Sequence, residues 1–250
     1  MIKNKKGIIF GIANDHSIAW GIAKKLHENG AKLAITYQNE TLFKRVKPLA
    51  DNVNSELLLE CDFSKDNALE TTFNEISNQW QNLDFIIHAA AYSDKNELNG
   101  RYVNTSKDNF IKSLNISCFS FTKIAKLAEP LMNNGGSLLT LSFYGSKKVM
   151  PNYNVMGVAK AALETSVKYL SVDLGNKNIR VNAISSGPMR TLAGAAISNA
   201  REVYKYTEEN SSLKRNVSLD ELGNTALYFV SDLSKAVTGE IHYVDCGFNI

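Results

Sequence analysis

A tyrosine and a lysine, Tyr153 and Lys160, stand seven positions apart in the stretch MPNYNVMGVAK. Their surroundings read as a helix, in which positions seven apart differ by about 700°, roughly 20° short of two full turns. The two side chains would then share one helix face. A lysine ammonium beside a phenol helps it to donate a hydrogen bond to an oxygen that gains negative charge. The pair is therefore a candidate for oxyanion or proton chemistry, although a tyrosine and a lysine on one exposed helix face are also common.

Strand and helix patterns alternate along the chain. Short apolar runs predict strands over 7–12, 31–37, 56–62, 83–91, 137–143, 179–187 and 240–247. Helices are expected over 17–29, 68–80, 106–132 (broken near Pro130), 191–207 and 218–231, and around the stretch quoted above. Nearly continuous apolar strands that alternate with helices are typical of a parallel sheet covered on both faces. Residues 1–250 are thus predicted to form a single doubly wound Rossmann-type α/β domain, a seven-stranded parallel sheet with helices on both faces.

The composition excludes several classes of protein. A net charge of +3, with scattered lysines, gives no reason to expect nucleic acid as a partner. Three cysteines without CxxC spacing and four isolated histidines argue against a metal site, so no metal is expected. No run of about 18 apolar residues exists, so no membrane insertion is expected. These features predict a cytoplasmic protein.

The first junction between a strand and a helix is rich in glycine. It reads GIANDHSIAWG, with Gly11 at the turn and Ser17 where the helix would begin. A glycine lets the backbone approach a pyrophosphate, and the helix N-terminus offers free N–H groups with a partial positive charge. The usual GxGxxG fingerprint is absent, so a glycine-rich turn with a serine cap is the competing interpretation.

The next two junctions favour a dinucleotide. Gln38 follows the second strand, where an adenosine ribose is normally bound. Glu40 lies close by, and no arginine or lysine stands at 37–40, so a ribose 2′-phosphate would meet negative charge. This favours NADH over NADPH. Asp62 and Phe63 follow the third strand, where they could contact the adenine, although an aspartate there is often only a turn residue.

Over essentially all of its length, the chain resembles the NADH-dependent enoyl-acyl carrier protein reductases, a divergent branch of the short-chain dehydrogenase/reductase superfamily. The resemblance is carried by GIANDHSIAWGIA, TYQNE, PNYNVMGVAKAALE, IRVNAISSGPMRTLA and GEIHYVDCGFN. Most of the superfamily spaces the tyrosine and lysine four apart, whereas the enoyl reductases space them seven apart, as here. The resemblance implies reduction of the trans-2 double bond of enoyl-acyl carrier protein thioesters by NADH, the last reductive step of type II fatty acid elongation.

The resemblance also implies a set of site residues. Tyr153 would hydrogen-bond the thioester carbonyl oxygen, and Lys160 would hold the nicotinamide ribose. The residues expected to bind cofactor are Gly11, Ser17, Ile18, Gln38, Asp62, Phe63, Ala89, Lys160, Met189 (through its backbone) and Thr191. Those expected at the substrate are Ala91, Ser93, Phe143, Tyr144, Tyr153, Met156, Ala193, Ala200 and Val203. A mobile segment at about 191–207 would cover the acyl chain.

Two departures from the family pattern concern the acyl site. Phe143 stands where the family usually has a second tyrosine, so a hydroxyl is lost. Tyr144 is adjacent, but successive strand residues face opposite sides, so it can substitute only if the strand has already turned at Gly145. In addition, Ala91 replaces a common glycine, while Ala200 and Val203 are smaller than the residues often found there. The pocket is expected to be narrower near the nicotinamide and wider at its mouth.

Partners follow from the resemblance. Acyl carrier protein is acidic, so its docking surface should be basic. Arg201 and Lys205 on the segment near the mouth, with Lys147 and Lys148, are candidates for that surface, although exposed lysines usually serve only solvation. Homotetramers are usual in the family.

Two alternatives remain open on the sequence. A short-chain reductase that acts on a ketone or imine would need the four-residue spacing of tyrosine and lysine. A catalytically silent NAD(H)-binding protein is favoured only by Phe143. Nucleotide binding without turnover would distinguish the silent protein from the enzyme.

Overall fold

Seven parallel strands form one sheet in the part of the chain that the computed structural model describes, residues 1–195 and 200–250. The strands are β1 (Lys6–Phe10), β2 (Lys32–Tyr37), β3 (Leu57–Glu60), β4 (Phe85–His88), β5 (Gly136–Phe143), β6 (Ile179–Ser186) and β7 (Ile241–Val244). Their order across the sheet is β3-β2-β1-β4-β5-β6-β7, so the order reverses between β1 and β4. The predicted doubly wound, seven-stranded parallel sheet is confirmed.

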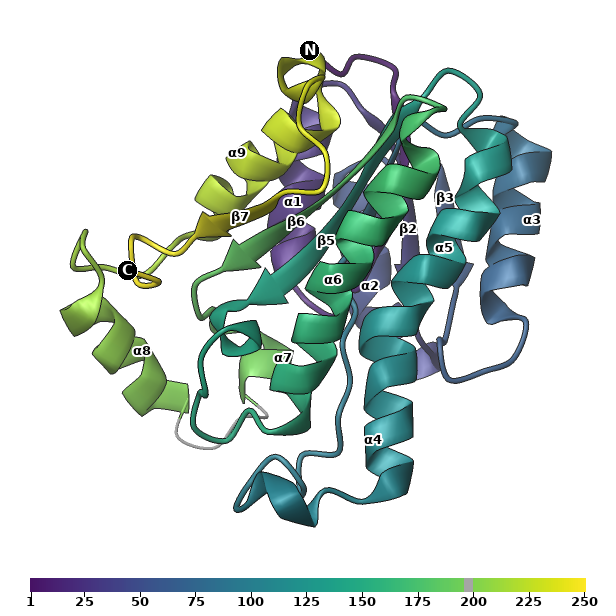
Figure 1. Cartoon of the computed structure of the whole chain (residues 1–250). Coiled ribbons are helices and arrows are strands. Elements are labelled where there is room, and N and C mark those ends of the chain that lie inside the picture. The colour runs from purple at the N-terminus through teal and green to yellow at the C-terminus, as the bar shows by residue number, and fades with distance from the viewer. Residues whose placement is uncertain (196–199) are drawn as a thin grey trace.

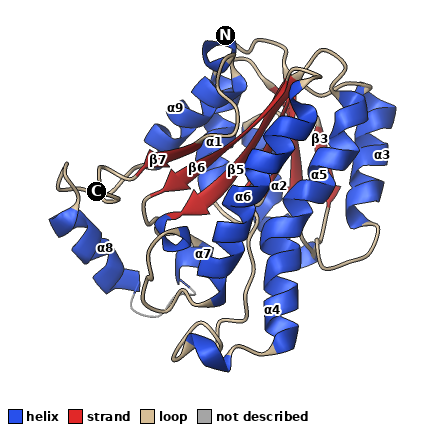
Figure 2. Ribbon diagram, in the orientation of Figure 1, coloured by secondary structure: helices blue, strands red, loops and turns tan. Residues whose placement is uncertain are grey.

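Helices cover both faces of the sheet. They are α1 (Ile18–Glu28), α2 (Glu40–Asn52), α3 (Ala68–Trp80), α4 (Lys107–Leu114), α5 (Ser120–Ala128), α6 (Val155–Gly175), α7 (Leu192–Ala195), α8 (Ala200–Asn210) and α9 (Leu219–Val230). Figure 1 shows α3, α4, α5 and α6 on one face and α1, α2 and α9 on the other. The short helix α7 and the helix α8 lie beyond the carboxyl ends of β5 and β6 (Figures 1 and 2).

The alternation of strand side chains explains this layering. The hydrophobic core has two large clusters, one on each face of the sheet. In β1, Ile9 belongs to the cluster that contains Ile22 of α1, whereas its neighbour Ile8 belongs to the cluster that contains Phe121 of α5. Successive residues of a strand point to opposite faces, so an apolar strand needs a helical layer on each side. Both clusters are formed by side chains that are almost wholly buried.

Some helices differ from the prediction. The expected helix over 106–132 is divided into α4, a π-helical turn at Asn115–Phe119, α5 and a 3-10 turn at Glu129–Leu131. Proline has no N–H to continue an α-helix, which explains the change of geometry around Pro130. The helix α2 was not predicted, although Asn39 caps it by accepting a hydrogen bond from the Leu42 N–H at 3.0 Å.

The prediction that Tyr153 lies inside a helix is wrong. The helix α6 begins at Val155, and Tyr153 belongs to the turn before it. Asn152 and Asn154, on either side of Tyr153, have positive φ angles of 59° and 36°, which are incompatible with a right-handed helix. Tyr153 and Lys160 therefore do not share a helix face, and the turn must orient Tyr153 toward Lys160.

No helix in the described ranges is both long enough and apolar enough to cross a membrane.

Candidate active site

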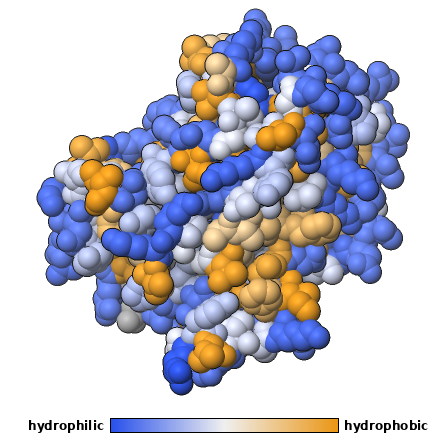
Figure 3. Space-filling model, viewed as in Figure 1, coloured by the Kyte–Doolittle hydropathy of each residue, from blue (hydrophilic) through white to orange (hydrophobic). Residues whose placement is uncertain are grey.

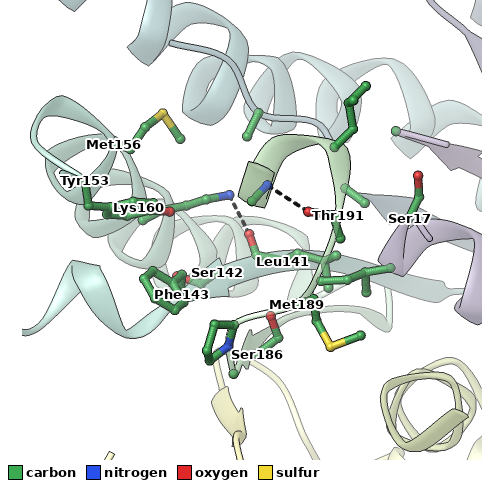
Figure 4. Close-up of a pocket in the computed structure, with 18 of the residues that line it drawn as sticks. Ser17, Leu141, Ser142, Phe143, Tyr153, Met156, Lys160, Ser186, Met189 and Thr191 are labelled. Carbon is green, nitrogen blue, oxygen red and sulfur yellow. Dashed lines mark hydrogen bonds between the residues drawn. The ribbon is translucent and has the colours of Figure 1, made fainter. Parts of the chain in front are cut away.

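A cavity of about 390 Å³ opens at the carboxyl ends of the central strands, where the strand order reverses. Ligands of doubly wound sheets bind at this place. The structure brings thirteen of the predicted site residues to its wall: Gly11, Ser17, Ile18, Ala89, Ala91, Ser93, Phe143, Tyr153, Met156, Lys160, Met189, Thr191 and Val203. Figure 4 shows Ser17 on one side of this space and Tyr153, Met156 and Lys160 on the other.

The glycine-rich turn fits the phosphate end of a dinucleotide. Gly11 has a φ of 101°, and a Cβ placed there would lie 2.4 Å from the carbonyl oxygen of Ala89, so only glycine is tolerated. Ser17 Oγ accepts hydrogen bonds from the N–H groups of Ala13 and Asn14 at 3.0 and 3.1 Å. Ser17 therefore orders the turn and makes no side-chain cap for α1. The helix N-terminus is left to an anion, as a pyrophosphate site requires.

Three predicted cofactor residues lie outside this cavity, at the ends of β2 and β3. The Gln38 side-chain amide donates to Asp62 Oδ1 at 3.4 Å, so these two residues are neighbours. The Phe63 ring stacks on the His88 ring at 5.9 Å between centroids and also packs on Phe10. Gln38 and Asp62 thus meet at the sheet edge where an adenosine would lie in a doubly wound fold.

Lys160 is a buried cation at the floor of the cavity. Its side chain is 6% exposed, and Nζ donates to the Leu141 carbonyl oxygen at 2.7 Å (Figure 4). Burial lowers the pKa of Lys160 from 10.5 to about 8, against the opposing effects of Cys118 and Glu164. The ammonium is thus held in place but incompletely solvated, and a ligand with hydroxyl acceptors would stabilise its charge.

Tyr153 is buried beside it. Its ring packs edge-on against Phe143 with centroids 4.9 Å apart. A Cβ at Gly145 would lie 2.4 Å from the Tyr153 ring, so the turn after β5 must carry a glycine for the tyrosine to sit there. Burial, with a smaller effect from Glu164, raises the pKa of Tyr153. The phenol therefore keeps its proton and can act as a hydrogen-bond donor.

A buried carboxylate, not anticipated from the sequence, braces the turn next to Tyr153. Glu164 lies four residues after Lys160 on α6 and is 1% exposed. Its Oε1 accepts hydrogen bonds from the hydroxyls of Ser142 and Ser146 at 2.6 and 2.5 Å, and its Oε2 lies 3.1 Å from Lys147 Nζ. Lys147 is therefore engaged in an ion pair. The spacing of four residues on one helix was the available signal for Glu164.

His88, behind the cavity at the end of β4, is a structural residue. Its Nδ1 lies 2.8 Å from Thr140 Oγ1 and its Nε2 lies 2.9 Å from Ser120 Oγ. Burial lowers the pKa of His88 to about 3, with a smaller effect from Lys160. The ring is neutral at physiological pH and supplies no cation to the site.

Tyr144 is not among the residues that line the cavity, and its contact with substrate stays a prediction. Its ring packs against Tyr243 and Phe248, with centroids 6.4 and 5.8 Å apart. A 3-10 turn begins at Tyr144, whereas Phe143 is the last residue of β5 and lines the cavity. These ring contacts hold Tyr144 outside the cavity lining, whereas Phe143 is part of it.

The expected covering segment closes one side of the cavity. Val203 and Tyr204 of α8 line it, and the Tyr204 hydroxyl donates to the Met189 carbonyl oxygen. Residues 196–199 of the expected covering segment, and the side chains of Ala193 and Ala200, which were expected at the substrate, lie outside what the structure describes. Tyr204 was missed because its contact to Met189 joins two elements that the sequence does not place together.

Other lining residues were also missed. They are Ala13, Ala19, Tyr92, Leu98, Leu141, Ser142, Met150, Pro151, Ser186, Gly187, Pro188, Leu192 and Gly194, with Tyr204. Most are apolar, so the wall suits a hydrocarbon chain. No group of three or more histidine, cysteine, aspartate or glutamate side chains arranged for a metal occurs among the described residues.

The phosphate turn at the switch point, together with a buried tyrosine and lysine in one cavity, defines a short-chain dehydrogenase/reductase. The sequence profile described as enoyl-(acyl carrier protein) reductase matches residues 11–249. This chain belongs to that family, which confirms the resemblance seen in the sequence.

Individual relatives cover almost the whole chain. It is 58% identical over 250 residues to enoyl-[acyl-carrier-protein] reductase [NADH] 2 of Rhizobium meliloti (strain 1021), covering 100% of this chain and 93% of the relative. The crystal structure of FabI from Candidatus Liberibacter asiaticus matches with a TM-score of 0.97 at 56% identity, over 99% of this chain and 96% of that one. The reductase from Anaplasma phagocytophilum, in complex with NAD, matches with a TM-score of 0.94 at 54% identity, over 99% and 92% of the two chains.

Proposed function

We propose that this protein uses NADH to reduce the trans-2 double bond of enoyl-acyl carrier protein thioesters, the last reductive step of type II fatty acid elongation. The observation that carries the proposal is the burial of Tyr153 and Lys160 in one apolar cavity with the phosphate turn at its other side. A relative at 58% identity is named as an NADH-dependent enoyl-[acyl-carrier-protein] reductase.

Tyr153 and Lys160 have different roles in the proposed reduction. NADH, when bound, supplies a hydride to the β-carbon of the enoyl thioester. Tyr153, whose pKa is raised by burial, then donates a hydrogen bond to the carbonyl oxygen as negative charge collects there. Lys160 orients the ribose hydroxyls and places its charge near the phenol. The apolar wall excludes water, which strengthens both interactions until a proton reaches the α-carbon.

The proposed cofactor residues are those predicted from the sequence. The pyrophosphate would be held by Gly11, Ser17 and Ile18. The adenosine would be bound by Gln38, Asp62 and Phe63. The nicotinamide half would be bound by Ala89, Lys160, Met189 and Thr191. The discrimination against NADPH is supported by Glu40 and Glu60 near Tyr37. Burial, and then these two carboxylates, raise the pKa of Tyr37, while Lys65 pairs with Glu60 at 2.8 Å. A ribose 2′-phosphate near the two carboxylates would be repelled.

The proposed substrate wall comprises Ala91, Ser93, Phe143, Met156 and Val203, to which Leu98 and Tyr204 are added from the cavity. Ala193, Ala200 and the mobility of the segment at about 191–207 remain proposals from family resemblance. For acyl carrier protein, Arg201, Lys205 and Lys148 are the proposed docking cations. Lys147 is withdrawn from this set because it pairs with buried Glu164.

Restoring the second tyrosine is expected to change little. In the variant Phe143→Tyr, kcat should stay within about threefold of the wild type, because Tyr153 alone faces the developing charge. The ring position is already packed against Tyr153, so the fold should tolerate the hydroxyl. Steady-state kinetics with an enoyl thioester measure this, and a gain of about tenfold or more would show that the missing hydroxyl limits turnover.

The activity itself is tested by the loss of NADH absorbance with a trans-2-enoyl thioester, run in parallel with NADPH and with a 3-oxoacyl thioester. Consumption of NADH with the enoyl substrate, and little with NADPH or the 3-oxoacyl substrate, is the expected result. Preference for the 3-oxoacyl thioester would instead identify a carbonyl reductase. Binding of NADH without any turnover would identify a catalytically silent protein.

We also propose a homotetramer. Large apolar side chains are exposed on one face of the protein. They are Ile111 of α4, Phe119 of the turn between α4 and α5, and Tyr169 and Val172 of α6. Figure 3 shows apolar surface on the face that α4 and α6 present in Figure 1. Exposed apolar patches of this kind mark association surfaces.

The three free cysteines support the further proposal of a reducing, cytoplasmic location.

Sedimentation equilibrium is expected to give four times the 27.6 kDa chain mass, reduced in a Tyr169→Glu, Val172→Glu variant because two charges would be buried at the contact. A wild-type mass of one chain would refute the tetramer. An unchanged mass in the variant would place the contact on another surface.

A further inference from the structure

Asn154, the residue after Tyr153, has an unusual backbone conformation. Its φ is 36° and its ψ is −121°, outside the regions that residues with a Cβ normally adopt. Such a conformation persists only where the surrounding structure holds it in place. It occurs here between the tyrosine of the proposed site and the first residue of α6.

The Asn154 side chain provides the restraint. Its Nδ2 lies 3.3, 3.0 and 3.3 Å from the carbonyl oxygens of Glu97, Leu98 and Gly100. These three residues belong to the loop between β4 and α4, which we call the roof loop and define as residues 92–105. The amide has two hydrogens, which the three carbonyl groups share. One side chain thus joins the roof loop to the start of the catalytic helix.

The roof loop forms part of the cavity wall. Leu98 is 4% exposed and packs in one cluster with Tyr153 and Met156. Tyr92 and Ser93 also line the cavity. On its other side the loop is tied to α4, because the Glu97 carboxylate accepts hydrogen bonds from the Ser106 N–H and hydroxyl at 2.9 and 2.7 Å. Asn154 therefore adds a hydrogen-bonded connection between this loop and the Tyr153 side of the cavity to the packing of Leu98.

We propose that Asn154 is a positioning residue that clasps the roof loop against Tyr153, so that Leu98 forms a fixed wall for the acyl chain. The identity of that ligand rests on the proposed function. Without the Asn154 side chain, the three carbonyl groups would accept hydrogen bonds from water, and Leu98 would lose its fixed position in the cavity wall. Affinity for the enoyl substrate should fall, while NADH, bound mainly by other elements, should be unaffected.

Two substitutions separate the side chain from the backbone. Asn154→Gly removes the amide but accepts the unusual φ, whereas Asn154→Ala removes the amide and retains the strain. Both variants are expected to raise KM for the enoyl thioester about tenfold, with kcat within about threefold and the NADH Kd within about twofold. Tm should fall more in Asn154→Ala than in Asn154→Gly, because only alanine retains the strain. Asn96→Ala, an exposed position on the same loop, is the matched control.

A wild-type KM in Asn154→Gly would overturn the clasp, since the backbone alone would then suffice. A double-mutant cycle with Leu98→Ala tests the route of the effect. If Asn154 acts through Leu98, the double variant should have about the same KM as either single variant, whereas independent effects would multiply to about a hundredfold. Multiplicative effects would overturn the proposal.

Amide hydrogen exchange without substrate keeps the test independent of turnover. Amides of the roof loop should exchange faster in Asn154→Gly, while those of α3 and β7 stay unchanged. Unchanged exchange in the loop would refute the clasp even if the enzyme is active. If the wild type reduces no enoyl thioester but the exchange difference is seen, the clasp stands and the proposed substrate is wrong.

Discussion

Replacing Tyr153 with phenylalanine is expected to lower kcat for enoyl reduction by about 10²–10³-fold. The change removes one hydroxyl and leaves the ring, which still packs against Phe143 and over Gly145. The lost hydrogen bond is one that strengthens as charge develops on the carbonyl oxygen, so its removal affects the transition state more than the bound substrate. Single-turnover kinetics with NADH and an enoyl thioester measure the effect.

The control for this variant is cofactor binding. The NADH Kd of Tyr153→Phe, measured by fluorescence, should stay within about twofold of the wild type, because Lys160 and the phosphate turn are unchanged. A kcat close to that of the wild type, with NADH binding intact, would show that another group stabilises the enolate. Since Phe143 has no hydroxyl, the next candidates would be the other polar groups of the cavity wall, such as Ser93 and Lys160.

Lys160→Met is expected to weaken NADH binding by about 10–100-fold, which corresponds to the loss of a hydrogen bond to a charged group. Methionine has a similar length and an apolar end, so it can occupy the buried channel beside Leu141. Titration of NADH into the variant measures the loss. Unchanged affinity would show that Lys160 does not reach the cofactor.

The same substitution has a second expected effect, on stability. Burial lowers the pKa of Lys160 from 10.5 to about 8, so between these values the unfolded chain holds a proton that the folded chain has released. The free energy of unfolding that Lys160 contributes therefore rises with pH across this window. Below about pH 8 the folded state carries the full cost of the buried ammonium, roughly 3 kcal/mol.

Comparing the two proteins isolates this contribution, because Cys61 and Tyr153 also titrate at high pH. Relative to the wild type, Lys160→Met should be most stable near neutral pH, and its advantage should shrink by roughly 3 kcal/mol as pH rises from about 8 to about 10.5. Urea denaturation at several pH values gives the difference. A difference independent of pH would mean that Lys160 has an ordinary pKa in the folded protein.

The architecture was predictable because its signal is repeated along the chain. Each buried strand is an apolar run, such as that containing Ile8 and Ile9, and each junction has turn residues, so single errors do not change the sheet. The helix over 106–132 was less predictable. Its register shifts within the π-helical turn at Asn115–Phe119, and no residue type there marks that change.

The site was predictable in its members more than in its geometry. Gly11, Tyr153 and Lys160 meet in the cavity as expected, yet Tyr153 reaches it from a turn whose asparagines adopt positive φ angles. Asparagine tolerates these angles better than most residues, but it also occurs widely elsewhere. The roles of Glu164 and Asn154 depend on contacts with Ser142 and with the loop at Leu98, which only the folded chain brings together.

The most direct test of the reaction is the destination of the hydride. NADH carrying deuterium at the transferred C4 position is mixed with the protein and a trans-2-enoyl thioester, and the product is analysed by mass spectrometry and NMR. One deuterium on the β-carbon of a saturated acyl thioester is the predicted result. Deuterium on a carbinol carbon, or an enoyl thioester recovered unchanged while NADH binds, would contradict enoyl reduction as the function of this protein.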